Sequence, residues 1–149
     1  MTISKRSFYH GAALAEVTDN RSFSSINRIP SINSYSAYQI NHNIGIYIKY
    51  TSDSDMFKFS FSSDNKEEIR KMNEIYQKNT YIALVCSEDG ICLLNYEMLI
   101  SCIDLQSDEN DWININRPNG CSYRVRGSKG ECDRSIPLNA FPNQIFLQA

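Results

Sequence analysis

The stretch Asn43–Phe61, with the sequence NIGIYIKYTSDSDMFKFSF, decides the fold. Apolar residues stand at every second position from 44 to 50 and again from 57 to 61. Such strict alternation is typical of half-buried antiparallel strands. The polar segment 51–55 joins the two runs as a turn. The stretch therefore predicts a β-hairpin, and it places Lys49 on one defined face of that hairpin.

Length and composition favour one folded domain. The chain has 149 residues, 42% of them hydrophobic, which suits a single globular domain spanning 1–149 that needs no disulfide or metal for stability. The net charge is −2 and the pI is about 5.7. This balance argues against a dedicated binder of duplex DNA, since such proteins carry a basic excess. It does not argue against a local basic face.

Membrane, secretion and metal signals are absent from the sequence. No apolar run approaches the roughly 18 residues of a membrane span, and the N-terminus lacks the apolar core of a secretion signal. The five cysteines include no Cys-x-x-Cys pair, and the chain has two histidines. We therefore expect a cytoplasmic protein with free buried thiols, no metal site and no cofactor.

Further along the chain the sequence predicts about three helices and two more hairpins. The helices are expected over 7–19, 64–76 and 95–103, capped by Ser7, Asp64 and Asn95 in turn. In the second helix, Ile75 is expected in the buried face and Lys66 in solvent.

The hairpins are expected over 81–94, around the turn Asp89–Gly90, and over 112–127, around the turn Arg117–Gly120. The result is an α+β fold with a single mixed, mostly antiparallel sheet built from three hairpins.

A basic strip in the third hairpin is the first candidate site. Arg124 and Arg126 are two positions apart on a predicted strand and so share a face, while Arg117 lies in the turn before and Lys129 follows between two glycines. Residues 113–134 hold five basic and two acidic side chains. Arginine suits phosphate geometry, so the strip predicts an anion or nucleic-acid site. The alternative is a solvated edge strand, where cations block aggregation.

The order of a helix, a lysine-bearing hairpin, a second helix and a strand resembles a restriction-endonuclease-like core. In that family an acid-x-Lys motif holds a metal ion that activates water. Here Tyr47 stands two positions before Lys49, where the family has a carboxylate, and the preceding turn offers Asn41 and Asn43. The resemblance therefore implies a degenerate core without the hydrolytic metal site.

A second resemblance rests on the run KRSFYHGAAL at 5–14, together with 43–50 and 84–86. These segments resemble small bacterial proteins of unassigned activity. The resemblance implies a bacterial or mobile-element origin for the protein. An association with a defence system is one form that this origin takes. This resemblance assigns no functional role to any residue.

Three functional hypotheses follow. The first is a binding or accessory module without enzyme activity, which recognises a protein or nucleic-acid partner through the basic strip. The second is a degenerate nuclease or other small hydrolase, with a pocket assembled from His10, Glu16 and Lys49. The third is a homodimer that uses an aromatic surface including Tyr35, Tyr38 and Tyr47. The acidic segment 104–111 is expected to be a solvated loop.

Overall fold

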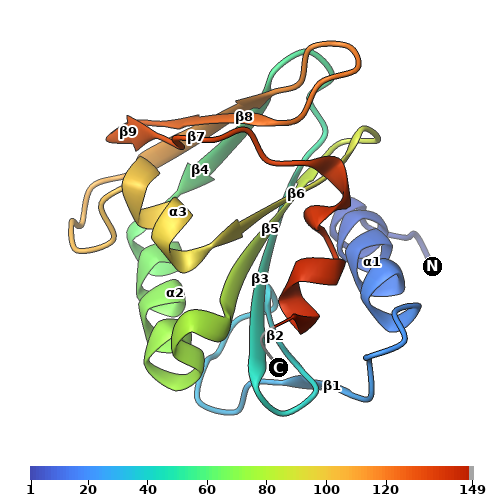
Figure 1. Cartoon of the computed structure of the whole chain (residues 1–149). Coiled ribbons are helices and arrows are strands. Elements are labelled where there is room, and N and C mark those ends of the chain that lie inside the picture. Colours follow the sequence, from blue (N-terminus) through green and yellow to red (C-terminus); the bar gives the residue numbers. More distant parts are fainter. Residues whose placement is uncertain (148–149) are drawn as a thin grey trace.

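Two β-sheets and three α-helices make up the fold, here described for residues 1–147 of a computed structural model (Figure 1). The five-stranded sheet has the order β1 (Ile26–Arg28), β2 (Ala37–Ile40), β3 (Ile44–Thr51), β5 (Thr80–Cys86), β6 (Gly90–Asn95). The four-stranded sheet has the order β4 (Phe57–Phe61), β7 (Asp111–Asn116), β8 (Arg124–Gly127), β9 (Gly130–Glu131). The helices are α1 (Lys5–Thr18), α2 (Ser63–Tyr76) and α3 (Tyr96–Cys102), with short 3₁₀ segments η1 (Gln77–Asn79), η2 (Leu138–Ala140) and η3 (Asn143–Phe146).

The α+β class is confirmed, but the single sheet and the first hairpin are wrong. β3 pairs antiparallel with β2 and parallel with β5, whereas β4 pairs antiparallel with β7. β3 is buried on both faces over residues 44–48, so it is a central strand rather than half of a two-stranded unit. The polar segment between β3 and β4 carries the chain from one sheet to the other. The two later hairpins, β5–β6 and β7–β8, are confirmed.

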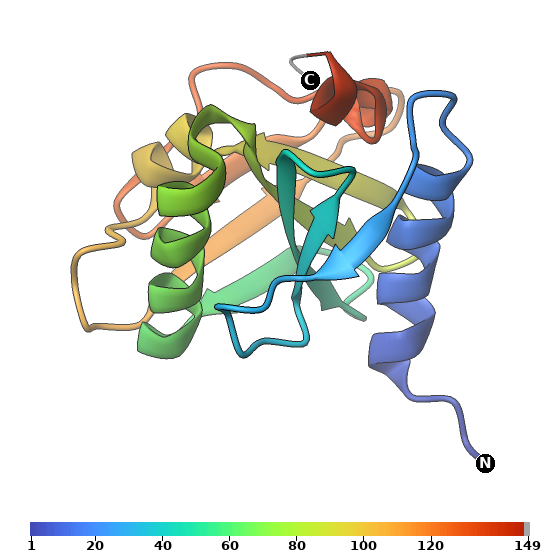
Figure 2. The same ribbon diagram turned by 90° about the horizontal axis from the view of Figure 1, so that it is seen from below.

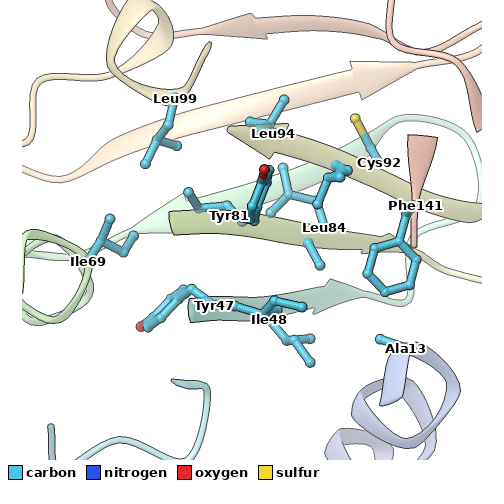
Figure 3. Close-up of a cluster of buried hydrophobic side chains, with 14 of the residues drawn as sticks. Ala13, Tyr47, Ile48, Ile69, Tyr81, Leu84, Cys92, Leu94, Leu99 and Phe141 are labelled. Atoms are coloured by element: carbon cyan, nitrogen blue, oxygen red, sulfur yellow. The ribbon is translucent and has the colours of Figure 1, made fainter. Parts of the chain in front are cut away.

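The five-stranded sheet is covered on both faces (Figures 1 and 2). On one face, Ile48 points toward Ala13 of α1, and Phe141 of the C-terminal segment lies over the same side (Figure 3). On the other face, Leu94 points toward Leu99 of α3, and α2 and the four-stranded sheet lie on this side as well (Figure 3). One cluster of buried side chains includes residues of both sheets.

Two of the three predicted helix caps are shifted. α1 begins after Ser4, whose Oγ accepts from the Ser7 amide at 3.1 Å. α2 begins after Ser62, which forms a capping box with Asn65, so Asp64 is not the cap. In α3 the predicted cap is confirmed, because Asn95 Oδ1 accepts from the Met98 amide at 2.8 Å.

The buried face of α2 also differs from the prediction. Lys66 is fully buried, whereas Ile75 is 49% exposed. Lys66 Nζ lies 2.8 Å from Asp111 Oδ2 and donates to the carbonyl oxygens of Ser107 and Glu109. The segment expected to be a solvated acidic loop therefore supplies a buried counter-charge, and that partner lets a lysine take a core position.

No helix within residues 1–147 combines the length and the apolar character needed to cross a membrane.

Candidate functional site

The four-stranded sheet has one buried and one open face. Its inner side chains pack into the core: Phe57, Phe59, Phe61, Ile113, Ile115 and Val125. The opposite positions carry the side chains that we call the outer face: Lys58, Ser60, Trp112, Asn114, Asn116, Arg124, Arg126 and Glu131. Among residues 1–147, no α-helix lies over this side of the sheet in Figure 1. The outer face is therefore open along all four strands.

Strand register fixes which outer-face residues are neighbours. Lys58 is paired with Asn114, which is paired with Arg126 in turn. Since neighbouring strands lie about 4.8 Å apart, Lys58 and Arg126 flank β7 at roughly 10 Å. The next pair along the same two strands is Asn116 with Arg124. The pairing thus brings together cations from segments far apart in the sequence.

The outer face combines positive charge with an aromatic ring. Lys58, Arg124 and Arg126 are opposed by Glu131, and within residues 1–147 none of these three cations forms an ion pair. Trp112 lies beside them on β7 and is 41% exposed. Unpaired guanidinium groups suit phosphate oxygens, and an exposed indole offers a stacking surface.

A hollow of about 390 Å³ borders β8 and extends the outer face. The chain after β9 is held along β8 by a hydrogen bond from the Cys132 amide to the Val125 carbonyl oxygen at 3.1 Å. This arrangement brings Arg134 to the hollow beside Arg124 and Arg126. Glu131 and Asp133 also line it, so the hollow carries both signs of charge.

Two members of the predicted strip are placed elsewhere. Arg117 is held by Asp89 through two hydrogen bonds of 2.8 and 2.7 Å, and Tyr123 donates to the same carboxylate at 2.9 Å. The hydrogen bond from Arg117 holds the pKa of Asp89 below its usual value. Lys129 lies in the β8–β9 turn and lines a hollow beside α3. Only Arg124 and Arg126 of the strip therefore share the outer face.

The alternative pocket is not assembled. His10 in α1 lies 3.0 Å (Nδ1) from the Tyr38 hydroxyl and packs edge-on to Tyr50. Lys49 is next to Tyr50 on β3, so it points to the opposite face of the sheet, where its Nζ donates to Asn65 Oδ1 at 3.0 Å. Glu16 lines a separate cleft of about 530 Å³ between α1 and the β5–β6 turn.

Burial lowers the pKa of both basic groups. Burial, with the nearby charges of Arg6 and Arg28, lowers the pKa of His10 to about 4. Burial lowers the pKa of Lys49 to about 8, although the charge of Glu68 opposes the shift. Each group is thus easier to deprotonate than in water, but the five-stranded sheet separates the two.

The tyrosines of the predicted dimer surface are mostly buried. Tyr47 donates to Glu68 Oε1 at 2.5 Å and accepts from Asn65 Nδ2 at 3.0 Å, which fixes it under α2. Tyr38 is also buried. Tyr35 is 71% exposed, with the guanidinium groups of Arg6 and Arg28 over its ring at 5.3 and 5.4 Å. An aromatic surface built from all three residues is therefore wrong.

No protein-family model and no curated protein matches the chain. Among solved structures, the fold is similar to that of Archaeoglobus fulgidus Hjc, a Holliday junction resolvase from an archaeal hyperthermophile. The TM-score is 0.45 and the identity 14%, over 64% of this chain and 75% of that chain. A likeness at this level transfers no residue role, so the functional argument rests on the chain itself.

Proposed function

We propose that this protein binds single-stranded nucleic acid across the outer face of its four-stranded sheet. The observation that carries the proposal is the strand register on a sheet face open to solvent. It places Lys58 and Arg126 on either side of Asn114, one outer-face position from the exposed Trp112, with Arg124 one position further along beside Asn116. In this arrangement the cations contact phosphates and Trp112 stacks on a base. Both contacts are sequence-tolerant, as in other proteins that bind single strands.

The polar residues of the outer face support a nucleic-acid ligand over a protein one. On β7, Asn114 lies between Lys58 and Arg126, and Asn116 is paired with Arg124. Each side-chain amide both donates and accepts hydrogen bonds. Residues two apart on one strand are about 6.8 Å apart, so Trp112, Asn114 and Asn116 form a short row along β7. A stacked indole needs an unpaired base, which favours a single strand over a duplex.

The test is salt-dependent binding of a fluorescent single-stranded oligonucleotide. The double variant Arg124→Ala/Arg126→Ala is expected to weaken binding at least about tenfold at low salt. The slope of log affinity against log salt is expected to fall by about 1.4, because two phosphate contacts are lost. The matched control is Lys5→Ala/Lys78→Ala, which removes two exposed cations outside the outer face. Equal losses in the two double variants would show attraction by overall charge and reject the proposed surface.

Trp112→Ala supplies a second arm of the same experiment. It is expected to weaken binding by about 1–3 kcal/mol through lost stacking while leaving the salt slope unchanged. Tyr35→Ala removes an exposed aromatic ring that is not part of the outer face and should leave affinity unchanged. Wild-type affinity in the Trp112 variant would rule out stacking on this face.

A further inference from the structure

Two cysteines outside the outer face lie in direct contact. Cys102 ends α3 and Cys132 follows β9, and their Sγ atoms are 3.6 Å apart. We propose that Cys102 and Cys132 form a redox-reactive pair, a modification site at which a hydroperoxide converts two thiols into a reversible disulfide. The proposal does not depend on nucleic-acid binding.

The backbone on both sides of the pair is anchored. The Lys129 amide donates to the Cys102 carbonyl oxygen at 2.9 Å, and the Cys132 amide donates to the Val125 carbonyl oxygen at 3.1 Å. Gly127 allows this approach, because a Cβ atom there would clash with the Cys102 backbone. The two sulfur atoms are therefore held together by the packing of α3 on the β8–β9 hairpin. A disulfide requires the two sulfur atoms to approach from 3.6 Å to about 2.05 Å.

Access and ionisation differ between the two thiols. Cys132 is half-buried and lines the hollows on both sides of it, whereas Cys102 is buried. The hydrogen bond from Cys132 lowers the pKa of the Cys102 thiol to about 7, against the effect of burial. The same hydrogen bond, together with burial, raises the pKa of the Cys132 thiol. The negative charge of the pair at neutral pH therefore lies on Cys102, which is placed to accept the proton of Cys132 when the Cys132 sulfur reacts.

The other buried thiols lack this activation. Burial raises the pKa of both Cys86 and Cys92. Since the thiolate is the reactive form, these two cysteines are expected to resist oxidation. Cys121 is exposed and serves as an internal reference.

The reaction has two balanced steps. The Cys132 sulfur attacks one oxygen of the hydroperoxide while its proton passes to the Cys102 thiolate, so an S–O bond forms, the O–O bond breaks, and hydroxide or alkoxide leaves. The Cys102 sulfur then attacks the resulting sulfenic sulfur and gives its proton to the departing hydroxide, so the S–S bond forms and the S–O bond breaks. The departing hydroxide takes a proton and leaves as water. Overall, two thiols are oxidised and one peroxide bond is reduced.

The experiment uses the full chain with Cys121→Ser, which removes the exposed thiol. After one equivalent of hydrogen peroxide, the number of free thiols is expected to fall by two. Peptide mapping should find one cross-linked species that joins Cys102 to Cys132, and dithiothreitol should restore both thiols. In the added Cys102→Ser variant no cross-link forms, and the Cys132 sulfenic acid should be trapped by dimedone.

Several results would contradict the proposed redox reactivity of Cys102 and Cys132. One is scrambled disulfides that include Cys86 or Cys92. Another is a cross-link between Cys102 and Cys132 that appears only in denaturant. A third is loss of the Cys132 thiol no faster than loss of the Cys121 thiol in the wild-type chain. Circular dichroism of each serine variant establishes that the fold is kept before these rates are compared.

Discussion

At the scale of single residues, His10 makes stability depend on pH. Its pKa is about 4 in the folded protein and about 6.5 in an unfolded chain. Between these values the unfolded state binds more protons, so stability falls as the pH is lowered through this range. The loss attributable to His10 is up to about 3 kcal/mol.

His10→Gln removes the titrating group and keeps a hydrogen-bonding side chain near Tyr38. We expect urea unfolding of this variant to lose less stability between about pH 7 and about pH 4 than the wild type. His42 is exposed, so His42→Gln is the matched control and should keep the wild-type slope. Identical slopes in the His10 variant and the wild type would contradict a neutral, buried histidine.

The candidate site shows what residue patterns alone can predict. Arg124 and Arg126 share a face because alternation along one strand requires it, and the sequence was sufficient there. Arg117 is excluded from the outer face by Asp89, a partner 28 positions away that no local pattern reveals. Lys58 and Trp112 were missed because their place beside the arginines follows from the pairing of β4 with β7.

At the scale of elements, α2 begins with a capping box formed by Ser62 and Asn65. Ser62 Oγ accepts from the Asn65 amide at 3.2 Å, and the Ser62 amide donates to Asn65 Oδ1 at 3.1 Å. Ser62→Ala is expected to lower the free energy of unfolding by about 1 kcal/mol. The neighbouring Ser63 is exposed and makes no capping bond, so Ser63→Ala should be nearly neutral. If chemical denaturation shows the same loss of unfolding free energy in Ser62→Ala and Ser63→Ala, Ser62 is not the cap.

Local signals located the helices well and their first residues less well. Asn95 was identified because a strong cap directly precedes an apolar stripe. Before α2, however, Ser62, Ser63 and Asp64 are all good capping residues, and the sequence does not rank them. In the structure β4 ends at Phe61, and Ser62, the first residue after the strand, is the cap of α2.

At the scale of the whole molecule, the ion pair of Lys66 and Asp111 ties α2 to the four-stranded sheet. Burial alone would raise the pKa of Asp111, but hydrogen bonds from Lys66, Ser128 and the Asp104 amide outweigh it and hold the pKa below its usual value. Removing one partner leaves the other charge buried without compensation. Lys66→Met is therefore expected to destabilise the protein by about 3–5 kcal/mol in denaturant unfolding.

The control lies on the same helix. Lys71 pairs with Glu67 at 3.6 Å, and both side chains are about half-exposed. Lys71→Met should change stability by less than about 0.5 kcal/mol. The double variant Lys66→Met/Asp111→Leu should recover part of the loss by removing the uncompensated charge. A Lys66→Met protein as stable as the Lys71→Met protein would contradict the role of the buried pair.

Sheet membership was the part of the fold that the sequence could not settle. The period-two pattern identifies β3 and β4 as strands, but it does not say which strand each one pairs with. β3 is paired through Ile46 and Ile48 with β5, a strand that follows only after α2. Pairing of this kind depends on which faces the helices cover, and that information is spread over the whole chain.

The alternation of the two sheets along the chain has a consequence for synthesis on the ribosome. When residues 1–61 have emerged, β3 lacks β5 and β4 lacks β7, so each strand exposes an open edge. Open apolar edges pair readily with other chains, and contacts distant in sequence form slowly. The nascent strands thus stay open to pairing with other chains until residues 80–116, which hold β5 and β7, are available.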